Sequence, residues 1–264
     1  MRADALFDDR GRVTVVTGAA SGLGLAMAEV MAENGAVVAM LDIDAVGLDA
    51  AVARLAAAGH AVEAVALDVG ETERLRAAIE ATAEKHGRLD VVFANAGISA
   101  GPGFQKPEGE IDAVDMTRWQ QVLQVNLTSV FVTLQAAAEH MKAQRGGRII
   151  VTSSIGGIRA ERMVGYAYAA TKAAVNNLVR QAALELAPYN VLVNAIAPGP
   201  FLTNIGGGRL HREPETVQKF VDIVPLGRLA RPDELKGLAL LLASPASSFI
   251  TGAVIPIDGG TTAG

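Results

Sequence analysis

Short apolar runs alternate with longer helical stretches along nearly the whole chain, and this alternation constrains the fold more than any other feature. Strands that alternate with helices predict a parallel sheet covered by helices on both faces. The runs are apolar throughout, which agrees, because the strands of such a sheet are buried on both sides. The seven predicted strands are Arg12–Thr17, Ala36–Leu41, Ala61–Leu67, Leu89–Ala94, Arg148–Ser153, Val191–Ile196 and Ala253–Ile257. We therefore predict an α/β fold with one doubly wound, mostly or fully parallel, seven-stranded sheet.

No stretch of the chain has the composition of a linker, and no internal repeat is visible, so we predict one domain over residues 1–264. Two segments rich in Gly and Pro interrupt the pattern, Ser99–Asp115 and Pro198–Asp222. Ligands of open parallel sheets bind beyond the carboxyl ends of the strands, so both segments should border a site. The second is long enough to form a substrate lid over about 198–222. The predicted helices are Gly22–Glu33, Ala45–Ala58, Glu71–His86, Met116–Gln144 and Val164–Pro188.

The composition excludes several classes of function. The formal net charge is −5 and charges of both signs are interspersed, so neither a nucleic acid nor an anionic membrane is an expected partner. The absence of cysteine excludes disulfides and thiolate metal sites, and no metal cluster of three residues is visible. The first ten residues carry alternating charges without an apolar region, and no apolar run is long enough to span a membrane. We expect a cytoplasmic protein.

A glycine-rich turn, Thr17–Gly24, separates the first predicted strand from the first helix. Glycines there permit a tight turn and let the backbone approach a pyrophosphate, which would lie at the N-terminus of the helix. Such a turn is a weak signal alone, but its place after the first strand of a repeated β/α pattern strengthens it.

Asp42 follows the second predicted strand, 18 residues beyond Gly24. A carboxylate at this place can accept hydrogen bonds from both adenosine ribose hydroxyls and would repel a 2′-phosphate. No Arg or Lys lies in the glycine-rich turn or directly after Asp42. These features favour NAD over NADP, although Asp42 could instead cap the helix that begins near Asp44.

Tyr168 and Lys172 are four residues apart in a predicted helix and therefore lie on one face of it. Reduction of a ketone by hydride requires a proton for the developing alkoxide, and a phenol can supply it. A phenol has a pKa of about 10, and a nearby ammonium and a cationic nicotinamide would both lower it. Tyr166 cannot act in this way, because the residue four positions on is Ala170.

Taken together, these motifs resemble those of the short-chain dehydrogenase/reductase family, in its shorter single-domain branch. The resemblance runs from about Gly11 to Gly260 and implies a Rossmann-type domain. The matching pieces, in order, are TGAASGLG (17–24), Asp42, Asp68-Val69, Asn95-Ala96-Gly97, Asn126, Ser153-Ser154, YAATK (168–172), and Pro198-Gly199 with Thr203.

The resemblance implies a role for each matching residue. Tyr168 would be the general acid in reduction and the base in oxidation, and Lys172 would hold the nicotinamide ribose and lower the pKa of the tyrosine. Ser154 would bind the substrate oxygen, and Asn126 would hold a water in a proton relay. The cofactor-binding set would be Gly18, Ser21, Gly22, Leu23, Gly24, Asp42, Ile43, Asp68, Val69, Asn95, Ala96, Gly97, Tyr168, Lys172, Pro198, Gly199 and Thr203.

Two of these assignments have alternatives. Ser154 stands 14 residues before Tyr168, where many family members have 13, so Ser153 remains a second candidate. Asn126 lies in an apolar stretch, where an unpaired amide would cost free energy, so its role could instead be structural.

The walls of the substrate pocket are predicted to be Ile98–Phe104, Ile155–Gly165 and Phe201–Phe220, with apolar surface from Phe104, Met163, Phe201 and Leu202. The same segments carry charged side chains that could attract an anionic substrate or simply be solvated: Arg159, Arg162, Arg209, His211 and Arg212.

The predicted function is an NAD-dependent oxidoreductase that interconverts an alcohol with a ketone or aldehyde. A sugar epimerase or dehydratase of the same superfamily is an alternative, but such proteins have a TGxxGxxG turn and a separate substrate domain. A non-catalytic NAD-sensing protein is another, but it should have lost part of the catalytic set. The resemblance also implies a homotetramer or homodimer.

Overall fold

Seven parallel strands form one sheet in the computed structural model, which describes residues 5–205, 208 and 212–263. The order across the sheet is β3-β2-β1-β4-β5-β6-β7, and every pair of neighbours is parallel. The predicted fold is therefore confirmed, with a fully parallel sheet. The strands are β1 (Val13–Thr17), β2 (Val37–Asp42), β3 (Val62–Ala66), β4 (Val91–Ala94), β5 (Gly147–Thr152), β6 (Val191–Pro198) and β7 (Val254–Ile257).

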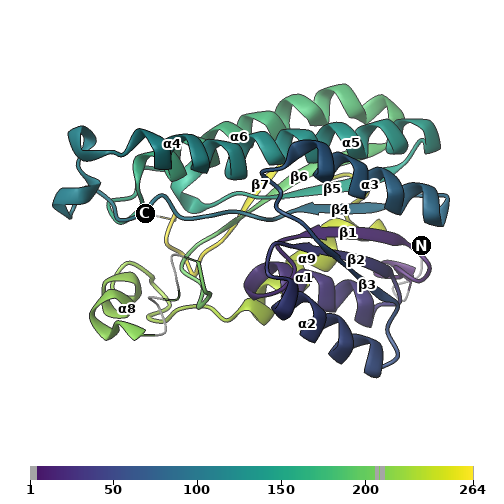
Figure 1. The fold of residues 1–264 in the computed structure, drawn as a ribbon, viewed down its shortest axis with the longest axis horizontal. Helices are drawn as coiled ribbons and strands as arrows, with labels where there is room; N and C mark the ends of the chain where they lie inside the picture. Colours follow the sequence, from purple (N-terminus) through teal and green to yellow (C-terminus); the bar gives the residue numbers. More distant parts are fainter. Residues whose placement is uncertain (1–4, 206–207, 209–211, 264) are drawn as a thin grey trace.

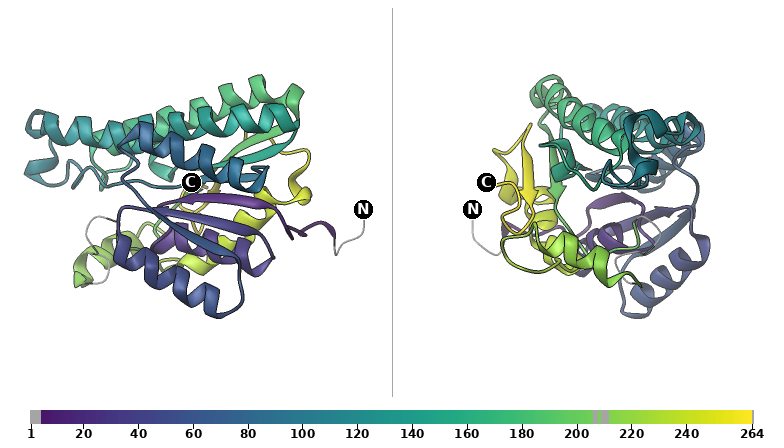
Figure 2. Two further views of the ribbon diagram at one scale, coloured as in Figure 1. Left: turned by 45° about the vertical axis from the view of Figure 1, so that its right-hand side comes forward. Right: turned by 90° about the vertical axis from the view of Figure 1, so that its left-hand side faces the viewer.

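Helices cover both faces of this sheet, as Figure 1 shows. The layer above it in that view contains α3 (Thr72–His86), α5 (Ser129–Gln144) and α6 (Tyr166–Leu186). The layer below contains α1 (Gly22–Glu33), α2 (Ala45–Ala57) and α9 (Lys236–Ala243). The short helix α8 (Pro214–Val221) lies away from the sheet, and the views of Figure 2 agree. No helix of the described residues is both long and apolar enough to cross a membrane.

Alternate side chains along the strands pack into two separate hydrophobic cores. Successive side chains of a strand point to opposite faces, and on β1 this places Val15 in one core and Val16 in the other. The first core packs against α3, α5 and α6, and the second against α1, α2 and α9. Continuously apolar strands are needed because both faces of the sheet are covered.

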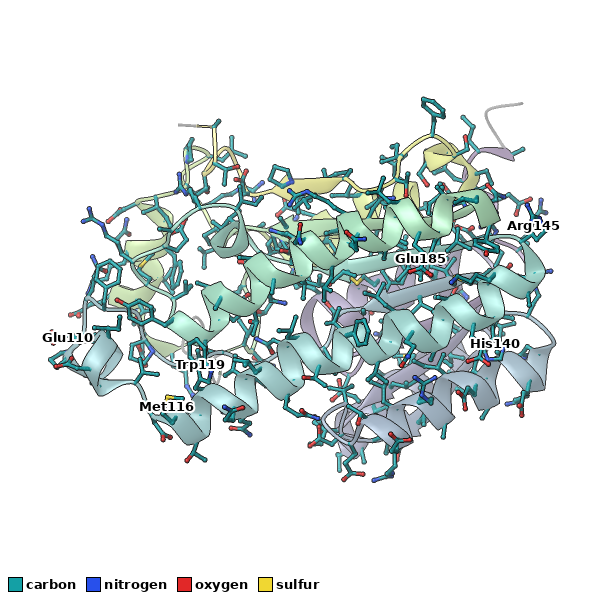
Figure 3. All side chains as sticks on the ribbon, turned by 90° about the horizontal axis from the view of Figure 1, so that it is seen from above. Glu110, Met116, Trp119, His140, Arg145 and Glu185 are labelled. Carbon is teal, nitrogen blue, oxygen red and sulfur yellow. The ribbon has the colours of Figure 1, made fainter. Side chains whose placement is uncertain are left out.

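The predicted helix Met116–Gln144 contains a local change of pitch. It consists of α4 (Met116–Leu123), a π-helical turn (Gln124–Thr128) and α5. Figure 3 shows α5 and α6 lying side by side across one face, with α4 near the labelled Met116 and Trp119. Turns of this π-helical kind are rare in proteins, and those that occur are often found at functional sites. This one contains Asn126.

The chain reverses its direction of travel across the sheet between β3 and β4. β1 lies between β2 and β4, so the helices that follow β1 and β4 cover opposite faces. A crevice forms at the carboxyl ends of strands on either side of such a reversal, and ligands of open α/β sheets bind there.

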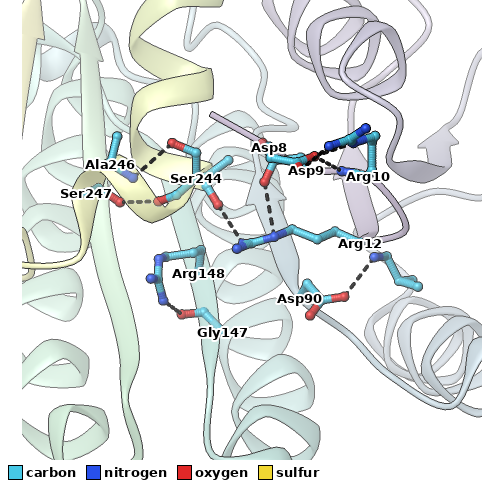
Figure 4. A network of polar contacts seen from close by, with 12 residues as sticks. Asp8, Asp9, Arg10, Arg12, Asp90, Gly147, Arg148, Ser244, Ala246 and Ser247 are labelled. Carbon is cyan, nitrogen blue, oxygen red and sulfur yellow. Dashed lines mark hydrogen bonds and ion pairs between the residues drawn. The ribbon is translucent and has the colours of Figure 1, made fainter. Parts of the chain in front are cut away.

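At the amino ends of the central strands, opposite this crevice, a network of charges ties the amino-terminal segment to the sheet (Figure 4). Arg12 pairs with Asp9 at 3.2 Å and donates a hydrogen bond to the carbonyl oxygen of Ala243. The Asp9 carboxylate is fully buried, and neither oxygen has a hydrogen-bond partner among the described residues. Desolvation therefore raises the pKa of Asp9 to about 6, against the opposing charge of Arg12.

We predict that Asp9→Asn makes stability less dependent on pH. The pKa of Asp9 is higher in the folded chain than its ordinary value of 3.8, so protonation stabilises the fold. That stabilisation is complete below about pH 4 and is lost as the pH rises through about 6. Between about pH 5 and about pH 7.5, the wild type should lose roughly 1 to 2 kcal/mol relative to the variant.

Urea unfolding at both pH values measures this difference. The lost contact with Arg12 adds an offset that does not vary with pH. Asp8→Asn is the control, because hydrogen bonds from Arg10 lower the pKa of Asp8 to about 2, outside this window. A difference between wild type and Asp9→Asn that stays constant from pH 5 to pH 7.5 would contradict the prediction.

Candidate active site

A cavity of about 500 Å³ lies at the carboxyl ends of the strands. It extends from Asp42, at the end of β2, past the glycine-rich turn to Tyr168 and Lys172 on α6. Every residue of the predicted cofactor-binding set lines it, and so does Ser154. Of the predicted catalytic and cofactor-binding residues, Asn126 alone is not part of this lining.

The glycine-rich turn is built so closely that side chains cannot replace its hydrogens. Gly18 has a φ of +69°, and a Cβ there would lie 2.9 Å from the Cα of Ala96. A Cβ on Gly24 would lie 2.0 Å from the carbonyl oxygen of Gly18. Ser21 precedes α1 without a side-chain capping bond, so the first amides of this helix remain available to an anion. The turn fits the pyrophosphate of a dinucleotide.

Asp42 is not the cap of α2. The carboxylate of Asp44 caps that helix by accepting a hydrogen bond from the amide of Gly47 at 3.0 Å. Asp42 instead accepts hydrogen bonds from the amides of Ala20, at 2.9 Å, and Asp44, at 3.0 Å. It thus braces the glycine-rich turn while its side chain borders the cavity.

Asn95 joins three strand ends beneath the cavity. Its side-chain amide donates to the carbonyl oxygen of Thr17, at 3.0 Å, and its oxygen accepts from the hydroxyl of Thr152, at 2.9 Å. The Thr17 hydroxyl in turn accepts from the backbone amides of Asn95 and Ala96. Thr17 was predicted only as the last residue of a strand and the first residue of the glycine-rich turn, and Thr152 only as a strand residue, since threonines are common in strands.

Tyr168 and Lys172 lie in the first two turns of α6. The Lys172 ammonium lies 5.6 Å from the centre of the Tyr168 ring and donates a hydrogen bond to the carbonyl oxygen of Thr152, at 2.6 Å. Only 3% of Lys172 is exposed. The ammonium has three N–H groups, and its other two have no partner among the described residues.

Burial dominates the pKa values of both residues. Desolvation lowers the pKa of Lys172 to about 8. Desolvation also raises the pKa of Tyr168, although a hydrogen bond with Ser154 opposes this effect. The net pKa of Tyr168 in the free chain is therefore raised, because desolvation is the largest effect on it.

The two adjacent serines face different surroundings. The Ser153 hydroxyl donates to the side-chain oxygen of Asn176, at 2.5 Å, inside the packing between β5 and α6. Ser154 is hydrogen-bonded to Tyr168 at the cavity, and its oxygen also accepts from the amide of Gly156, at 3.1 Å. Of the two hydroxyls, that of Ser154 is the one placed beside the phenol.

Both polar atoms of the Asn126 side chain form hydrogen bonds within the protein. Its oxygen accepts from the amide of Ile98, at 2.8 Å, and its nitrogen donates to the carbonyl oxygen of Ile98, at 2.9 Å. The residue is fully buried. Its side chain thus fixes the segment after β4, and a water held by Asn126 would have to use its backbone.

The predicted apolar wall is partly different in the structure. Met163 and Phe201 line the cavity, but Phe104 and Leu202 do not. The loop containing Phe104 pairs with the opposite wall through a bridge between Pro102 and Val164, and the Phe104 side chain remains 47% exposed. Apolar surface comes instead from residues that the sequence analysis did not single out, Phe220 and Ile223 among them.

Of the predicted wall arginines, those within the described residues do not line the cavity. Arg159 pairs with Glu161 at 2.8 Å, and Arg162 and Arg212 are exposed. Arg209 and His211 lie outside the described residues. The charged side chain that does line this part of the cavity is Glu161, which the sequence analysis passed over between two arginines.

Comparisons with known proteins agree with this arrangement. The family model described as enoyl-(acyl carrier protein) reductase matches residues 18–262. The chain is 40% identical to cis-4-hydroxycyclohexanecarboxylate dehydrogenase of Sinomonas cyclohexanicum, over 96% of this chain and 97% of that protein. A short-chain type dehydrogenase/reductase from Mycobacterium marinum superimposes with a TM-score of 0.90 at 33% identity, covering all of both chains.

Similar solved structures contain either nicotinamide cofactor. A gluconate 5-dehydrogenase from Burkholderia cenocepacia, solved with NADP and tartrate, has a TM-score of 0.90 at 33% identity and covers all of both chains. A 3-oxoacyl-[acyl-carrier protein] reductase from Brucella melitensis, solved with NAD, has a TM-score of 0.85 at 33% identity over 97% of this chain and 93% of that one.

We predict that Gly24→Ala abolishes dinucleotide binding. The added methyl group would overlap the carbonyl oxygen of Gly18, so the turn must open. The Kd for NAD, measured by calorimetry, should rise by about 100-fold or more. Gly237→Ala is the matched control, because a Cβ there meets nothing within 4 Å. Wild-type affinity in a folded Gly24→Ala variant would show that the turn does not contact the dinucleotide.

Proposed function

The chain belongs to the short-chain dehydrogenase/reductase family, and from this membership and the geometry above we propose an NAD-dependent enzyme that interconverts an alcohol with a ketone or aldehyde. Oxidoreduction of alcohols and carbonyl compounds with a nicotinamide cofactor is the activity that the relatives share. The observation that carries the proposal is the hydrogen-bonded pair of Tyr168 and Ser154 at the cavity, with the Lys172 ammonium beside the phenol ring.

Tyr168 is the proposed acid and base. The nicotinamide supplies the acceptor or donor of hydride when it is bound. In reduction, Tyr168 gives its proton to the oxygen of the carbonyl group, and the raised pKa of the phenol keeps this proton in place at neutral pH. In oxidation the phenolate takes the proton of the alcohol. Ser154 holds the same substrate oxygen and, by its hydrogen bond to Tyr168, stabilises the phenolate.

Lys172 has two proposed tasks. Its two unpartnered N–H groups suit the hydroxyls of the nicotinamide ribose. Its charge, 5.6 Å from the centre of the ring, favours the phenolate. Asn126 contributes through Ile98, whose backbone it holds beside the cavity, and its own backbone is the part available to a water of the proposed proton relay.

The preference for NAD rests on Asp42. Its carboxylate lies at the adenosine end of the cavity, with oxygens already fixed by two backbone amides. No arginine lines the cavity among the described residues, so nothing in this lining would neutralise a 2′-phosphate near Asp42. Repulsion between the carboxylate and that phosphate disfavours NADP.

The segment from Pro198 to Asp222 is the proposed lid. It carries α8, whose Thr216 and Phe220 line the cavity, so movement of α8 would change access to the substrate end. A homodimer or homotetramer is also part of the proposal. Exposed apolar side chains on α5 and α6, Phe131 and Leu184, suit such contacts. A cytoplasmic location remains a prediction.

We predict that Tyr168→Phe lowers kcat by about 100-fold to 10,000-fold, because the proton donor is lost. The variant should still bind NAD, because the glycine-rich turn, Asp42 and Lys172 are unchanged. The assay is NADH formation with a panel of primary and secondary alcohols, sugars and hydroxy acids. Tyr166→Phe is the control, since this tyrosine stands two residues away and does not line the cavity. A Tyr168→Phe enzyme with wild-type turnover would refute the proposed mechanism.

We predict that Asp42→Ala reduces the preference for NAD over NADP, measured as the ratio of kcat/KM values, by about 10-fold or more. Two ribose hydrogen bonds are lost, and so is the repulsion of the 2′-phosphate. Asp44→Ala serves for comparison, because it removes a nearby carboxylate that caps α2 without lining the cavity. An unchanged ratio in Asp42→Ala would reject the assignment of Asp42.

A further inference from the structure

Glu161 places a buried carboxylate at the substrate end of the cavity. Four charged residues line the cavity within the described chain, and two of them, Asp42 and Asp68, are at the adenosine end. Lys172 lies beside the phenol of Tyr168. Glu161 comes from the loop between β5 and α6, and its side chain is only 10% exposed. A carboxylate so far removed from solvent requires hydrogen bonds for both oxygens.

Only one of those oxygens is used by the protein. The Glu161 Oε1 accepts a hydrogen bond from the Nε of Arg159 at 2.8 Å. No described residue donates a hydrogen bond to Oε2. Arg159 does not line the cavity. Arg159 therefore holds Glu161 from outside the cavity lining, and no described residue occupies Oε2.

Glu161 is close to the group that holds the reacting oxygen. Both surround Gly156, where a Cβ would lie 3.6 Å from the Ser154 oxygen and 3.9 Å from the Cγ of Glu161. A substrate whose reacting oxygen lies on Ser154 and Tyr168 would thus have Glu161 within the span of one small ring or a short chain. Met163 and Val164, from the same loop, supply apolar surface next to it.

We propose that Glu161 is a specificity-determining residue that accepts a hydrogen bond from a second hydroxyl group of the substrate. The enzyme then selects diols and polyols, together with the hydroxyketones formed from them. This inference rests on the proposed function, because it assumes that the first hydroxyl reacts at Tyr168.

Other substrate chemistries fit this subsite less well. A simple alcohol leaves Oε2 without a donor from either protein or substrate, which costs free energy. A carboxylate at the same place would meet the charge of Glu161, while the neutralising Arg159 is not part of the cavity lining. The second group must therefore be a donor, and a neutral hydroxyl is a donor that desolvates at low cost.

The test compares matched compounds on three proteins: wild type, Glu161→Gln and Arg162→Gln. Glutamine keeps an oxygen for Arg159 but removes the charge from the subsite. Arg162 is on the same loop, is exposed and does not line the cavity, which makes it the matched control. The compounds are cyclohexanol, the cyclohexanediol isomers and a hydroxycyclohexanecarboxylate, with butanol and butanediol as the open-chain pair. Oxidation gives kcat/KM, and calorimetry in the presence of NADH gives binding without turnover.

Wild type should prefer at least one diol over its matched alcohol by about 10-fold to 100-fold, in kcat/KM and in affinity. Glu161→Gln should reduce this ratio to near one, leave the simple alcohol within about 3-fold, and improve the hydroxy acid. Arg162→Gln should change none of these ratios. Equal use of diols and simple alcohols by the wild type, or an unchanged ratio in Glu161→Gln, would overturn the inference alone. Oxidation of no alcohol by wild type would overturn the proposed function, and the binding ratio would still decide the role of Glu161.

Discussion

Hydrogen bonds between the carboxyl ends of β1, β4 and β5 hold the rest of the site in place. Backbone groups at the end of a buried strand have no neighbour to continue the ladder, and each unpaired group would cost free energy. Here hydrogen bonds with side chains satisfy these backbone groups in place of a neighbouring strand. The Thr17 hydroxyl accepts from two amides after β4, and Asn95 bonds to the ends of both β1 and β5. The turn over Gly18 and the backbone beneath Lys172 therefore have fixed positions relative to each other.

The fixed positions of these strand ends explain how Lys172 can be almost completely buried. An isolated ammonium in a protein interior would lose its hydration without compensation, and its pKa falls accordingly. The carbonyl oxygen of Thr152 replaces one water for Lys172, and the cavity leaves two N–H groups for a ligand. The same position brings the ammonium beside Tyr168, so that one residue can bind the cofactor and influence the phenol. A surface lysine would do neither, because solvent would screen its charge.

Patterns of local origin could be predicted from the sequence, and contacts between distant segments could not. The parallel sheet follows from apolar strands alternating with helices, and the glycine-rich turn follows from its place after β1. The serine register is different. Spacing could not separate Ser153 from Ser154, whereas the structure buries one hydroxyl against Asn176 and directs the other to Tyr168. The substrate wall was the weakest prediction, since the packing of two loops through Pro102 and Val164 decides which side chains face the cavity.

Charge along the cavity varies in a way that matches different parts of the proposed ligands. The adenosine end carries Asp42, the centre carries Lys172, and the substrate end carries Glu161. Each charge is held by the protein on one side: Asp42 by two amides, Lys172 by a carbonyl oxygen and Glu161 by Arg159. Because these partners are already in place, a ligand need not reorganise them on binding, and each charge retains an unfilled direction toward the cavity. Arg159, which as sequence could have attracted an anionic ligand or been solvated, has a different role in the fold. Arg159 stabilises the Glu161 carboxylate from outside the cavity lining. At Glu161 the cavity therefore offers a substrate a hydrogen-bond acceptor.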